Sequence, residues 1–148
     1  MEALDPLSLA FDQARAAAAL GEVPVGAVVV RDGEILGVAH NQTLTGHDPT
    51  AHAEVLAIRQ AAAKIGSERL IGCDLYVTLE PCAMCAGAIS FARIRRLYFS
   101  APDPKGGAVD FGPRFFAQPT CHHAPEVYGG LRESEAAELL RDFFKERR

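Results

Sequence analysis

The segment from Asp74 to Phe91 decides the fold, and it reads DLYVTLEPCAMCAGAISF. Its first six residues are mostly apolar or β-favouring, which is typical of a central strand. Pro81 is well placed as the first residue of a following helix, because that position needs no backbone amide donor. The segment therefore predicts a strand over 74–79 and a helix that runs to about Phe91, with two cysteines at the junction.

The flanking sequence extends this pattern of strands and helices. Apolar runs at 27–31 and 34–39 flank Asp32-Gly33, which is a strong two-residue hairpin signal. The alanine-rich run 51–64 predicts a helix, and 96–100 a further strand. Because parallel strands need crossovers, this order predicts parallel neighbours with helices packed on the sheet.

The ends of the chain are helical in this interpretation. An opening helix is expected over 6–20 and a closing helix over 134–147, with Phe143 and Phe144 on its apolar face. These phenylalanines serve either as packing groups or as base-stacking groups. Between the last strand and this helix, 101–130 contains five glycines and five prolines and predicts a long loop with a short strand or helical turn.

The length and composition of the chain indicate a single folded domain. A chain of 148 residues with 49% hydrophobic content has the size of a single domain, 1–148. It contains no apolar run of roughly 18 residues and no basic start followed by an apolar core, so we expect no membrane span and a cytoplasmic location. Four cysteines do not make a disulfide framework, and a reducing compartment suits metal thiolates.

Three residues have the pattern of metal ligands. Cys82 and Cys85 lie three apart, so the first turn of a helix places both sulfurs on one side, where the positive helix end favours thiolates. His52 is also expected in a first helical turn, because Asp48-Pro49 resembles an N-cap followed by proline. The rim of the sheet is where two such helix starts converge.

This set of ligands predicts a catalytic zinc ion, one per chain. Catalytic zinc keeps three protein ligands and leaves the fourth position open to water, whereas structural zinc usually has four protein ligands. Glu54 lies two residues after His52 and is not needed as a ligand. Zinc lowers the pKa of its water to roughly 7, so a neighbouring carboxylate can take up and pass on the proton.

Other interpretations of these residues remain open at this point. Pro-Cys-x-x-Cys by itself also fits a redox dithiol or half of a zinc ribbon, and the protein is then a non-catalytic zinc module. Glu54 argues for an enzyme, because a structural site has no use for that carboxylate. Cys121-His122-His123 is either a second metal site or surface, and Cys73 is expected as a small buried thiol.

His-x-Glu followed by Pro-Cys-x-x-Cys is the signature of zinc nucleobase deaminases. The chain resembles the cytidine deaminase superfamily and, within it, the bacterial tRNA adenosine deaminases. The resemblance is carried by residues 22–27 (EVPVGA), 47–54 (HDPTAHAE), 76–88 (YVTLEPCAMCAGA) and Asp142-Phe143-Phe144. It is weakest from Gly107 to Gly130, a region that lies close to the nucleic acid in that family.

The resemblance implies a fold and a set of substrate contacts. The fold is a three-layer α/β/α cytidine-deaminase-like architecture, with a central mixed sheet of about five strands. Asn41 is expected to hydrogen-bond the purine, the backbone amide of Ala53 to contact the base, and Pro24-Val25 to form an apolar wall. Asp103 is expected beside the sugar, with Lys105 nearby for phosphate. For Asn41 and Asp103 the alternative is turn chemistry, because both residues are predicted to lie in loops.

The resemblance also implies a substrate and a partner. The substrate is adenosine at the wobble position of a tRNA anticodon stem-loop, the product is inosine, and the enzyme is a homodimer. The alternative within the same chemistry is a deaminase of a free base or nucleoside, such as guanine or cytosine. The net charge of −4 argues against RNA, but 93–96 and 141–148 contain clusters of arginine and lysine that are available for phosphates.

Overall fold

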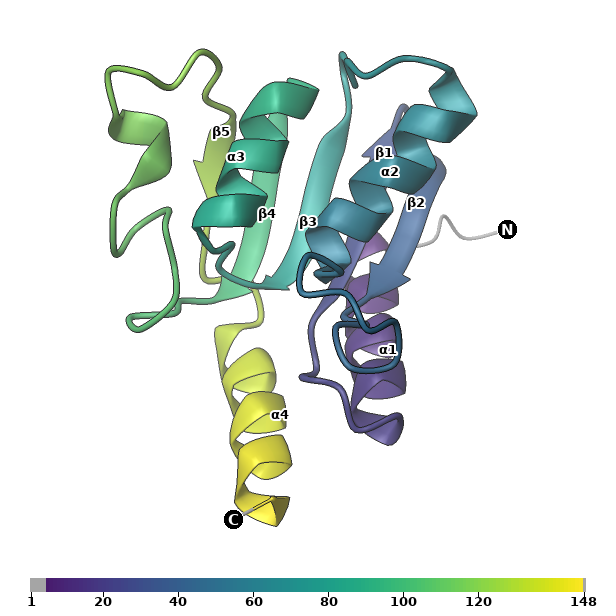
Figure 1. Ribbon diagram of the computed structural model, residues 1–148, viewed down its shortest axis with the longest axis vertical. Helices are drawn as coiled ribbons and strands as arrows, with labels where there is room; N and C mark the ends of the chain where they lie inside the picture. The colour runs from purple at the N-terminus through teal and green to yellow at the C-terminus, as the bar shows by residue number, and fades with distance from the viewer. Residues whose placement is uncertain (1–4, 148) are drawn as a thin grey trace.

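The computed structural model describes residues 5–147, in which helices and strands alternate (Figure 1). In chain order the elements are α1 (Pro6–Ala19), β1 (Gly26–Arg31), β2 (Glu34–His40), α2 (Ala53–Ile65), β3 (Asp74–Leu79), α3 (Ala83–Ala92), β4 (Arg96–Ala101), the 3-10 helix η1 (Phe115–Ala117), β5 (Glu126–Tyr128) and α4 (Glu133–Glu146). Arg148, which belongs to the predicted C-terminal basic cluster, lies outside the described residues.

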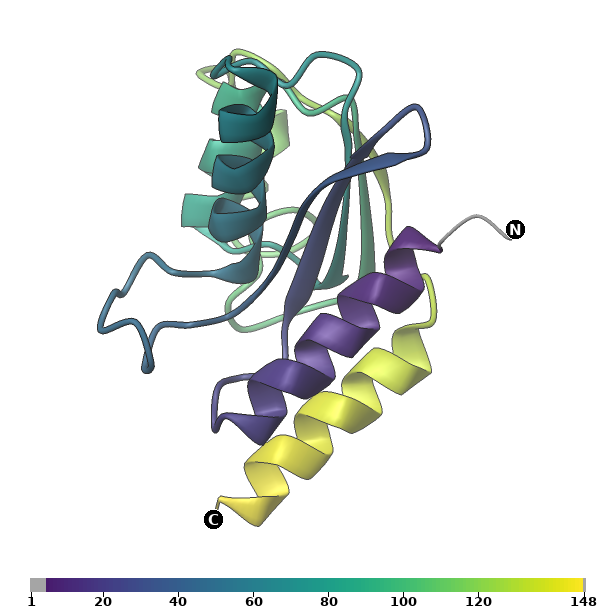
Figure 2. The ribbon, with the colours of Figure 1, turned by 90° about the vertical axis from the view of Figure 1, so that its right-hand side faces the viewer.

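The five strands form one mixed sheet in the order β2-β1-β3-β4-β5. β1 is antiparallel to both of its neighbours, whereas β3, β4 and β5 are parallel. Helices α2 and α3 cover one face, and α1 and α4 lie on the other (Figure 2). The predicted three-layer fold with a mixed sheet is therefore confirmed.

The prediction of parallel neighbours is wrong for one pair of strands, β2 and β3. The chain leaves β2 through α2 and arrives at β3, but β3 pairs with antiparallel β1 and not with β2. The reason is burial: five successive residues of β1 are buried, whereas β2 contains exposed and half-buried positions. The strand with the continuous apolar run takes the inner position, and the mixed one becomes the edge.

The hairpin between β1 and β2 is confirmed at the predicted residues. Asp32 and Gly33 both have positive φ, +50° and +79°, as a two-residue type I′ turn requires.

At the opposite end of the sheet, segments that follow three different strands come together. Because β1 runs against the other strands, its start lies beside the ends of β2, β3 and β4, and the segments that follow those strands meet there.

Two glycines let the helices approach the sheet closely. A Cβ at Gly26 of β1 would overlap the backbone oxygen of Ala10 in α1, and a Cβ at Gly37 of β2 would overlap that of Ala57 in α2. The core between the sheet and α2/α3 includes Leu75, Val77, Leu97 and Phe99 together with alanines of α2. Small residues on the helix thus bring α2, and the site residues at its start, close to the sheet.

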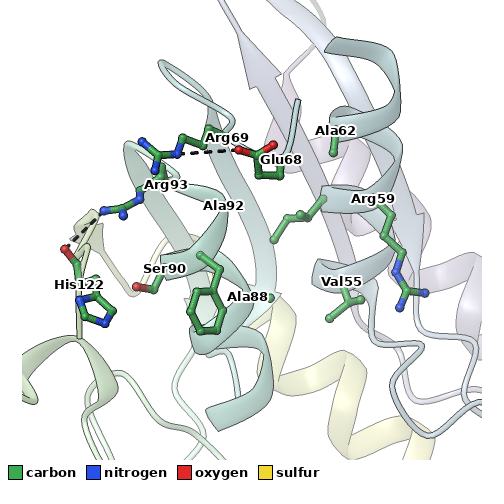
Figure 3. A pocket seen from close by; sticks show the side chains of 12 residues that line it. Val55, Arg59, Ala62, Glu68, Arg69, Ala88, Ser90, Ala92, Arg93 and His122 are labelled. Atoms are coloured by element: carbon green, nitrogen blue, oxygen red, sulfur yellow. Dashed lines mark hydrogen bonds and ion pairs between the residues drawn. The ribbon is translucent and has the colours of Figure 1, made fainter. Parts of the chain in front are cut away.

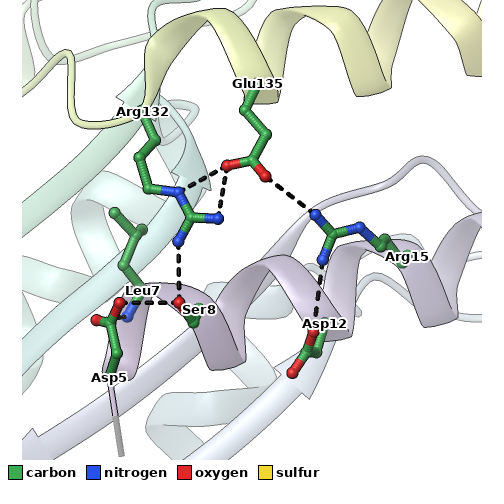
Figure 4. A network of polar contacts seen from close by, with 7 residues as sticks. All are labelled: Asp5, Leu7, Ser8, Asp12, Arg15, Arg132 and Glu135. Atoms are coloured by element: carbon green, nitrogen blue, oxygen red, sulfur yellow. Dashed lines mark hydrogen bonds and ion pairs between the residues drawn. The ribbon is translucent and has the colours of Figure 1, made fainter.

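The two termini of the fold lie side by side as α1 and α4 (Figure 4). The guanidinium of Arg132 stands 4.3 Å from the ring centroid of Phe11 and donates to Ser8 Oγ at 3.0 Å, while Glu135 pairs with Arg15 at 3.1 Å. Phe143 is buried, as expected of a packing group, whereas Phe144 is exposed.

In residues 5–147 we find no helix that combines the length and the apolar character of a membrane span.

Candidate active site

The three predicted metal ligands meet where the starts of α2 and α3 face each other. His52 and Cys82 are the N-cap residues of these helices and have extended backbone, while Cys85 lies in the first turn of α3. The expectation that His52 and Cys82 lie inside the first turns is wrong by one position. Asp48 does not cap α2, because its side chain accepts hydrogen bonds from Thr50 and closes a separate turn.

The donor atoms fit a tetrahedral zinc ion. His52 Nδ1 lies 3.5 Å from the sulfurs of both Cys82 and Cys85, and all three donor atoms lie within 4.8 Å of one another. Ordinary zinc bond lengths around a tetrahedron place nitrogen and sulfur ligands about 3.5 Å apart. Within residues 5–147, this is the one group of at least three His, Cys, Asp or Glu side chains gathered so closely.

The electrostatics of the cluster favour a thiolate. The hydrogen bond with the Cys85 thiol, followed by that with His52, lowers the pKa of Cys82 to about 4. The pKa of His52 is raised chiefly by its hydrogen bond with Cys82. A thiolate next to an imidazole at a helix start is the form in which cysteine binds a metal.

Glu54 is the second residue of α2 and is almost completely buried, with 4% of its surface exposed. Burial raises the pKa of this carboxyl to about 7. The carboxylate of Glu54 is not one of the three clustered donor atoms, but Glu54 lines the same cavity as His52 and Cys82. The structure thus separates three side chains that could bind a metal from a neighbouring carboxyl.

This cavity has a volume of about 300 Å³ and lies at the end of the sheet where β1 begins and β2, β3 and β4 end. Of the predicted substrate contacts, it brings together Val25, Asn41, Ala53 and Asp103. Pro24 is buried but is not part of the cavity wall, and Val23 lines it instead. Lys105 is exposed and also lies outside the wall.

The wall also contains residues that the sequence analysis did not single out: Val23, Thr43, Leu79, Glu80 and Gly106. Leu79 is the last residue of β3, and the others follow or precede a strand at the same end of the sheet. The signal that would have found them is the antiparallel direction of β1, which places the residues before β1 next to those after β2 and β3. The hairpin signal at Asp32-Gly33 predicts that β1 is antiparallel to β2, but no pattern in the sequence predicts that β1 also pairs with β3.

Asn41 and Asp103 differ in what their side chains do. The buried Oδ1 of Asn41 has no hydrogen-bond partner within the part of the chain that the structure describes. Such an atom loses its hydration without compensation unless a ligand supplies a donor. Oδ1 of Asp103, in contrast, accepts from the backbone amides of Lys105 and Gly106, which is the turn chemistry weighed above.

The remaining candidates have structural roles. Cys73 is buried, and Cys121 lies 3.6 Å from Ser90 Oγ. His123 contacts the backbone oxygen of Ile94 at 2.7 Å through Nε2. Among the basic residues, Arg95 pairs with Asp74 at 2.9 Å and Arg96 with Glu126 at 2.7 Å. The guanidinium of Arg147 stands 3.6 Å above the ring of Phe143.

Comparison with known proteins agrees with this geometry. A family model for MafB19-like deaminases matches residues 1–148. A tRNA-specific adenosine deaminase of Agrobacterium fabrum is 62% identical over 142 residues, which are 96% of this chain and 93% of that protein. The chain belongs to the MafB19-like deaminase family and, within it, to the group of the tRNA-specific adenosine deaminases.

Among solved structures, a tRNA deaminase is more similar to this chain than a guanine deaminase is. One, from biochemical and structural studies of A-to-I editing by tRNA:A34 deaminases at the wobble position, has a TM-score of 0.90 and 61% identity and covers 91% of this chain and 98% of its own. The guanine deaminase of Bacillus subtilis has a TM-score of 0.67 and 34% identity, with coverages of 96% and 95%. The fold is thus shared with free-base deaminases, but the similarity to the tRNA enzymes is greater.

Proposed function

We propose that the whole chain forms one deaminase domain that converts adenosine to inosine at the wobble position of a tRNA anticodon, releasing ammonia. The observation that carries this proposal is the set His52, Cys82 and Cys85 with Glu54 buried in the same cavity. The 62% identity with a tRNA-specific adenosine deaminase supports RNA as the substrate.

The chemistry follows from the donor set. His52, Cys82 and Cys85 would hold zinc, which supplies Lewis-acid activation of water when bound. Glu54 accepts the proton from that water, delivers it to the ring nitrogen of the purine and then protonates the departing amine. The water oxygen bonds to C6 of the purine, and the second proton of the water then passes through Glu54 to the exocyclic amine. The bond between C6 and that nitrogen breaks, so that adenosine and water become inosine and ammonia.

The remaining wall selects and holds the base. The amide of Asn41 and the backbone amide of Ala53 are proposed as hydrogen-bond partners of the purine, and Val25 as its apolar contact. Asp103 is proposed to contact the sugar of the same nucleotide. Pro24, which precedes Val25 in the sequence, is buried, and Lys105 is exposed and is proposed to contact phosphate. An anticodon loop already holds its bases largely unpaired, which makes one of them easy to turn into a cavity of this size.

We propose further that the protein acts as a homodimer through the outer face of α2 and α3. A groove of about 630 Å³ lies between these helices and is lined by Val55, Ile58, Ala62, Ala88 and Phe91, with arginines at its edge (Figure 3). Phe91 is 75% exposed. A second copy fits this face, since an isologous interface lets each phenylalanine enter the groove of its partner.

The cytoplasm is the proposed location. All four cysteines are unbridged, and two of them form the metal cluster. A reducing compartment maintains this state, and tRNA is available there.

The direct test compares substrates. Purified protein is incubated with an anticodon stem-loop that has adenosine at the wobble position, and separately with adenosine, guanine and cytosine. We expect inosine in the RNA, far slower reaction of the free compounds, and a rate on RNA that falls with added salt because counterions compete for phosphate contacts. Efficient turnover of a free base without inosine in the RNA would instead establish a free-base deaminase.

A further inference from the structure

Glu80 lies between β3 and the metal-binding Cys82, and it is a buried carboxylate with 2% of its surface exposed. Oε1 accepts a hydrogen bond from the backbone amide of Asp103 at 3.0 Å. Oε2 accepts three more, from the amides of Val109, Asp110 and Phe111, at 3.1, 3.1 and 3.2 Å. One side chain therefore binds four amides of a segment that lies 23 to 31 residues further along the chain.

Both carboxylate oxygens of Glu80 thus accept hydrogen bonds from backbone amides. Hydrogen bonds between an ionised carboxylate and amides are among the stronger ones in proteins, and they offset the cost of burying the charge. Each of the two oxygens is committed to amides of one and the same segment. Its contacts point to a mechanical role in holding the segment 103–111.

The segment that Glu80 holds forms one wall of the active-site cavity. Asp103 and Gly106 line the cavity, and the Asp103 side chain accepts from the amide of Gly106 at 3.0 Å. The amide of Ala108 adds a bond to the backbone oxygen of Pro81 at 2.9 Å. Glu80 and Pro81 thus join this wall directly to Cys82 and the start of α3, where two of the three candidate metal ligands lie.

Gly107 fits closely against this carboxylate. A Cβ at position 107 would overlap Glu80 Oε2 and the backbone oxygen of Asp103. A glycine is therefore required for the segment to fold over the carboxylate, which gives a second way to disturb the same contact without changing Glu80 itself.

We propose that Glu80 is a positioning residue, which holds the segment 103–111 against the metal site so that Asp103 meets the sugar of the substrate nucleotide. This proposal rests on the proposed function for its substrate, whereas the hydrogen bonds themselves are a property of the fold. Glu80 acts through Asp103, so its effect on the reaction depends on the presence of that side chain.

The decisive variant is Glu80→Gln, which keeps the shape of the side chain. An amide group has a single oxygen, so it leaves either one or three of the four backbone donors without an acceptor. We expect a loss of roughly 10-fold or more in kcat/KM on the anticodon stem-loop, the scale typical for residues that orient a metal site, with zinc content unchanged. The loss should appear mainly in KM, because Glu54 and the metal ligands are untouched.

Glu22→Gln is the matched control for stability. Glu22 is also fully buried and accepts two backbone amides, those of Leu44 and Thr45, but it holds the opposite wall of the cavity. Both variants are combined with Asp103→Asn, which retains an acceptor for the turn. Glu80→Gln should cost little more once Asp103 is replaced, whereas the effect of Glu22→Gln should add in full. Full additivity for Glu80 would overturn the proposal.

Amide hydrogen exchange tests the contact independently of activity. Glu80→Gln should speed exchange at least about 10-fold at one of the two sets of amides that Glu80 binds, either Asp103 or Val109, Asp110 and Phe111, depending on which oxygen the amide group replaces. Gly107→Ala should speed exchange in the same amides, and Glu22→Gln should leave both sets unchanged. Unchanged exchange in Glu80→Gln would also overturn the proposal. If the wild-type protein fails to deaminate the stem-loop, the proposed function fails, while the exchange measurement still decides whether Glu80 holds this segment.

Discussion

Cys82 and Cys85 provide two of the three donor atoms that lie together in the candidate metal site. Replacing Cys82 by alanine leaves two protein ligands, which rarely retain zinc. We expect the Cys82→Ala protein to lose nearly all of its zinc, measured per chain by metal analysis, from one ion in the wild type. Cys73→Ala is the control, because Cys73 is buried away from the cluster and should leave the zinc content at one. Full zinc in Cys82→Ala would refute the ligand assignment.

Glu54 is the residue whose change should separate catalysis from metal binding. Glu54→Gln keeps the size of the buried side chain but removes its ability to carry a proton. Turnover should fall by roughly 10² to 10⁴, the usual contribution of a general acid or base, while zinc content and the unfolding midpoint stay close to wild type. Glu138→Gln on the exposed side of α4 serves as the control. Loss of zinc from Glu54→Gln would make the carboxylate a ligand.

The sequence predicted which side chains gather at the candidate metal cluster, but it did not predict the residues that hold the surrounding segments in place. His52, Glu54, Cys82 and Cys85 have characteristic types and spacings, so a pattern can find them. Glu80 is adjacent to Pro81, but its partners are backbone amides 23 to 31 positions away. Because every residue except proline has such an amide, no spacing of side chains reveals this kind of contact.

At the scale of elements, Gly37 determines how closely α2 lies on the sheet. A methyl group there would overlap the backbone oxygen of Ala57, so that the helix must move outward. Gly37→Ala should lower the free energy of unfolding by about 1–3 kcal/mol, as overpacking typically does. Chemical denaturation measures this change. In Gly87→Ala the new methyl meets its nearest atom at an ordinary 3.9 Å, so that variant should be at least as stable as wild type.

The loop between β2 and α2 should respond to acid through Glu22. Burial opposes ionisation of this carboxyl, but hydrogen bonds from Thr45 and Leu44 outweigh it, and the pKa lies below its ordinary value of 4.5. The folded state therefore binds the proton more weakly than the unfolded state does. This contribution to stability is complete above pH 4.5 and is lost as the pH falls through the lowered pKa.

Denaturation measured between pH 6 and pH 3 tests this contribution. Stability should fall more steeply with acid in the wild type than in Glu22→Gln, which has no carboxyl to protonate at this position. Parallel curves for the two proteins would show that the hydrogen bonds to Thr45 and Leu44 do not depend on the charge of Glu22.

The helix starts show where local sequence signals compete. Asp48-Pro49 has the residue types of a helix start, but the Asp48 side chain closes a turn on Thr50 and the helix begins at Ala53. The hairpin at Asp32-Gly33 was predicted correctly, because both positive φ angles are met by those two residues alone. The turn at Asp32-Gly33 needs no distant contacts, and its sequence signal was reliable. The start of α2 was not predicted by its local signal, since the helix begins only after His52.

At the scale of the whole molecule, the exposed face of α2 and α3 should govern assembly. Burying Phe91 in a partner's groove is worth about 1.5–3 kcal/mol per side chain, and a charge there reverses this contribution. We expect Phe91→Asp to shift the protein from dimer to monomer in light scattering at micromolar concentration. Phe144→Asp is the control, because Phe144 is exposed on α4, away from the groove. A dimeric Phe91→Asp protein would place the interface elsewhere.

Because β1 is the one strand that runs against the others, the two ends of the sheet differ in function. The cavity wall is collected at one end, where β1 starts and β2, β3 and β4 finish, and the Asp32-Gly33 turn lies at the other. Tolerance to substitution should therefore be graded along the direction of the strands. A deep mutational scan would show a restrictive end and a permissive end, and the turn at 32–33 would be the natural point at which to insert a reporter domain.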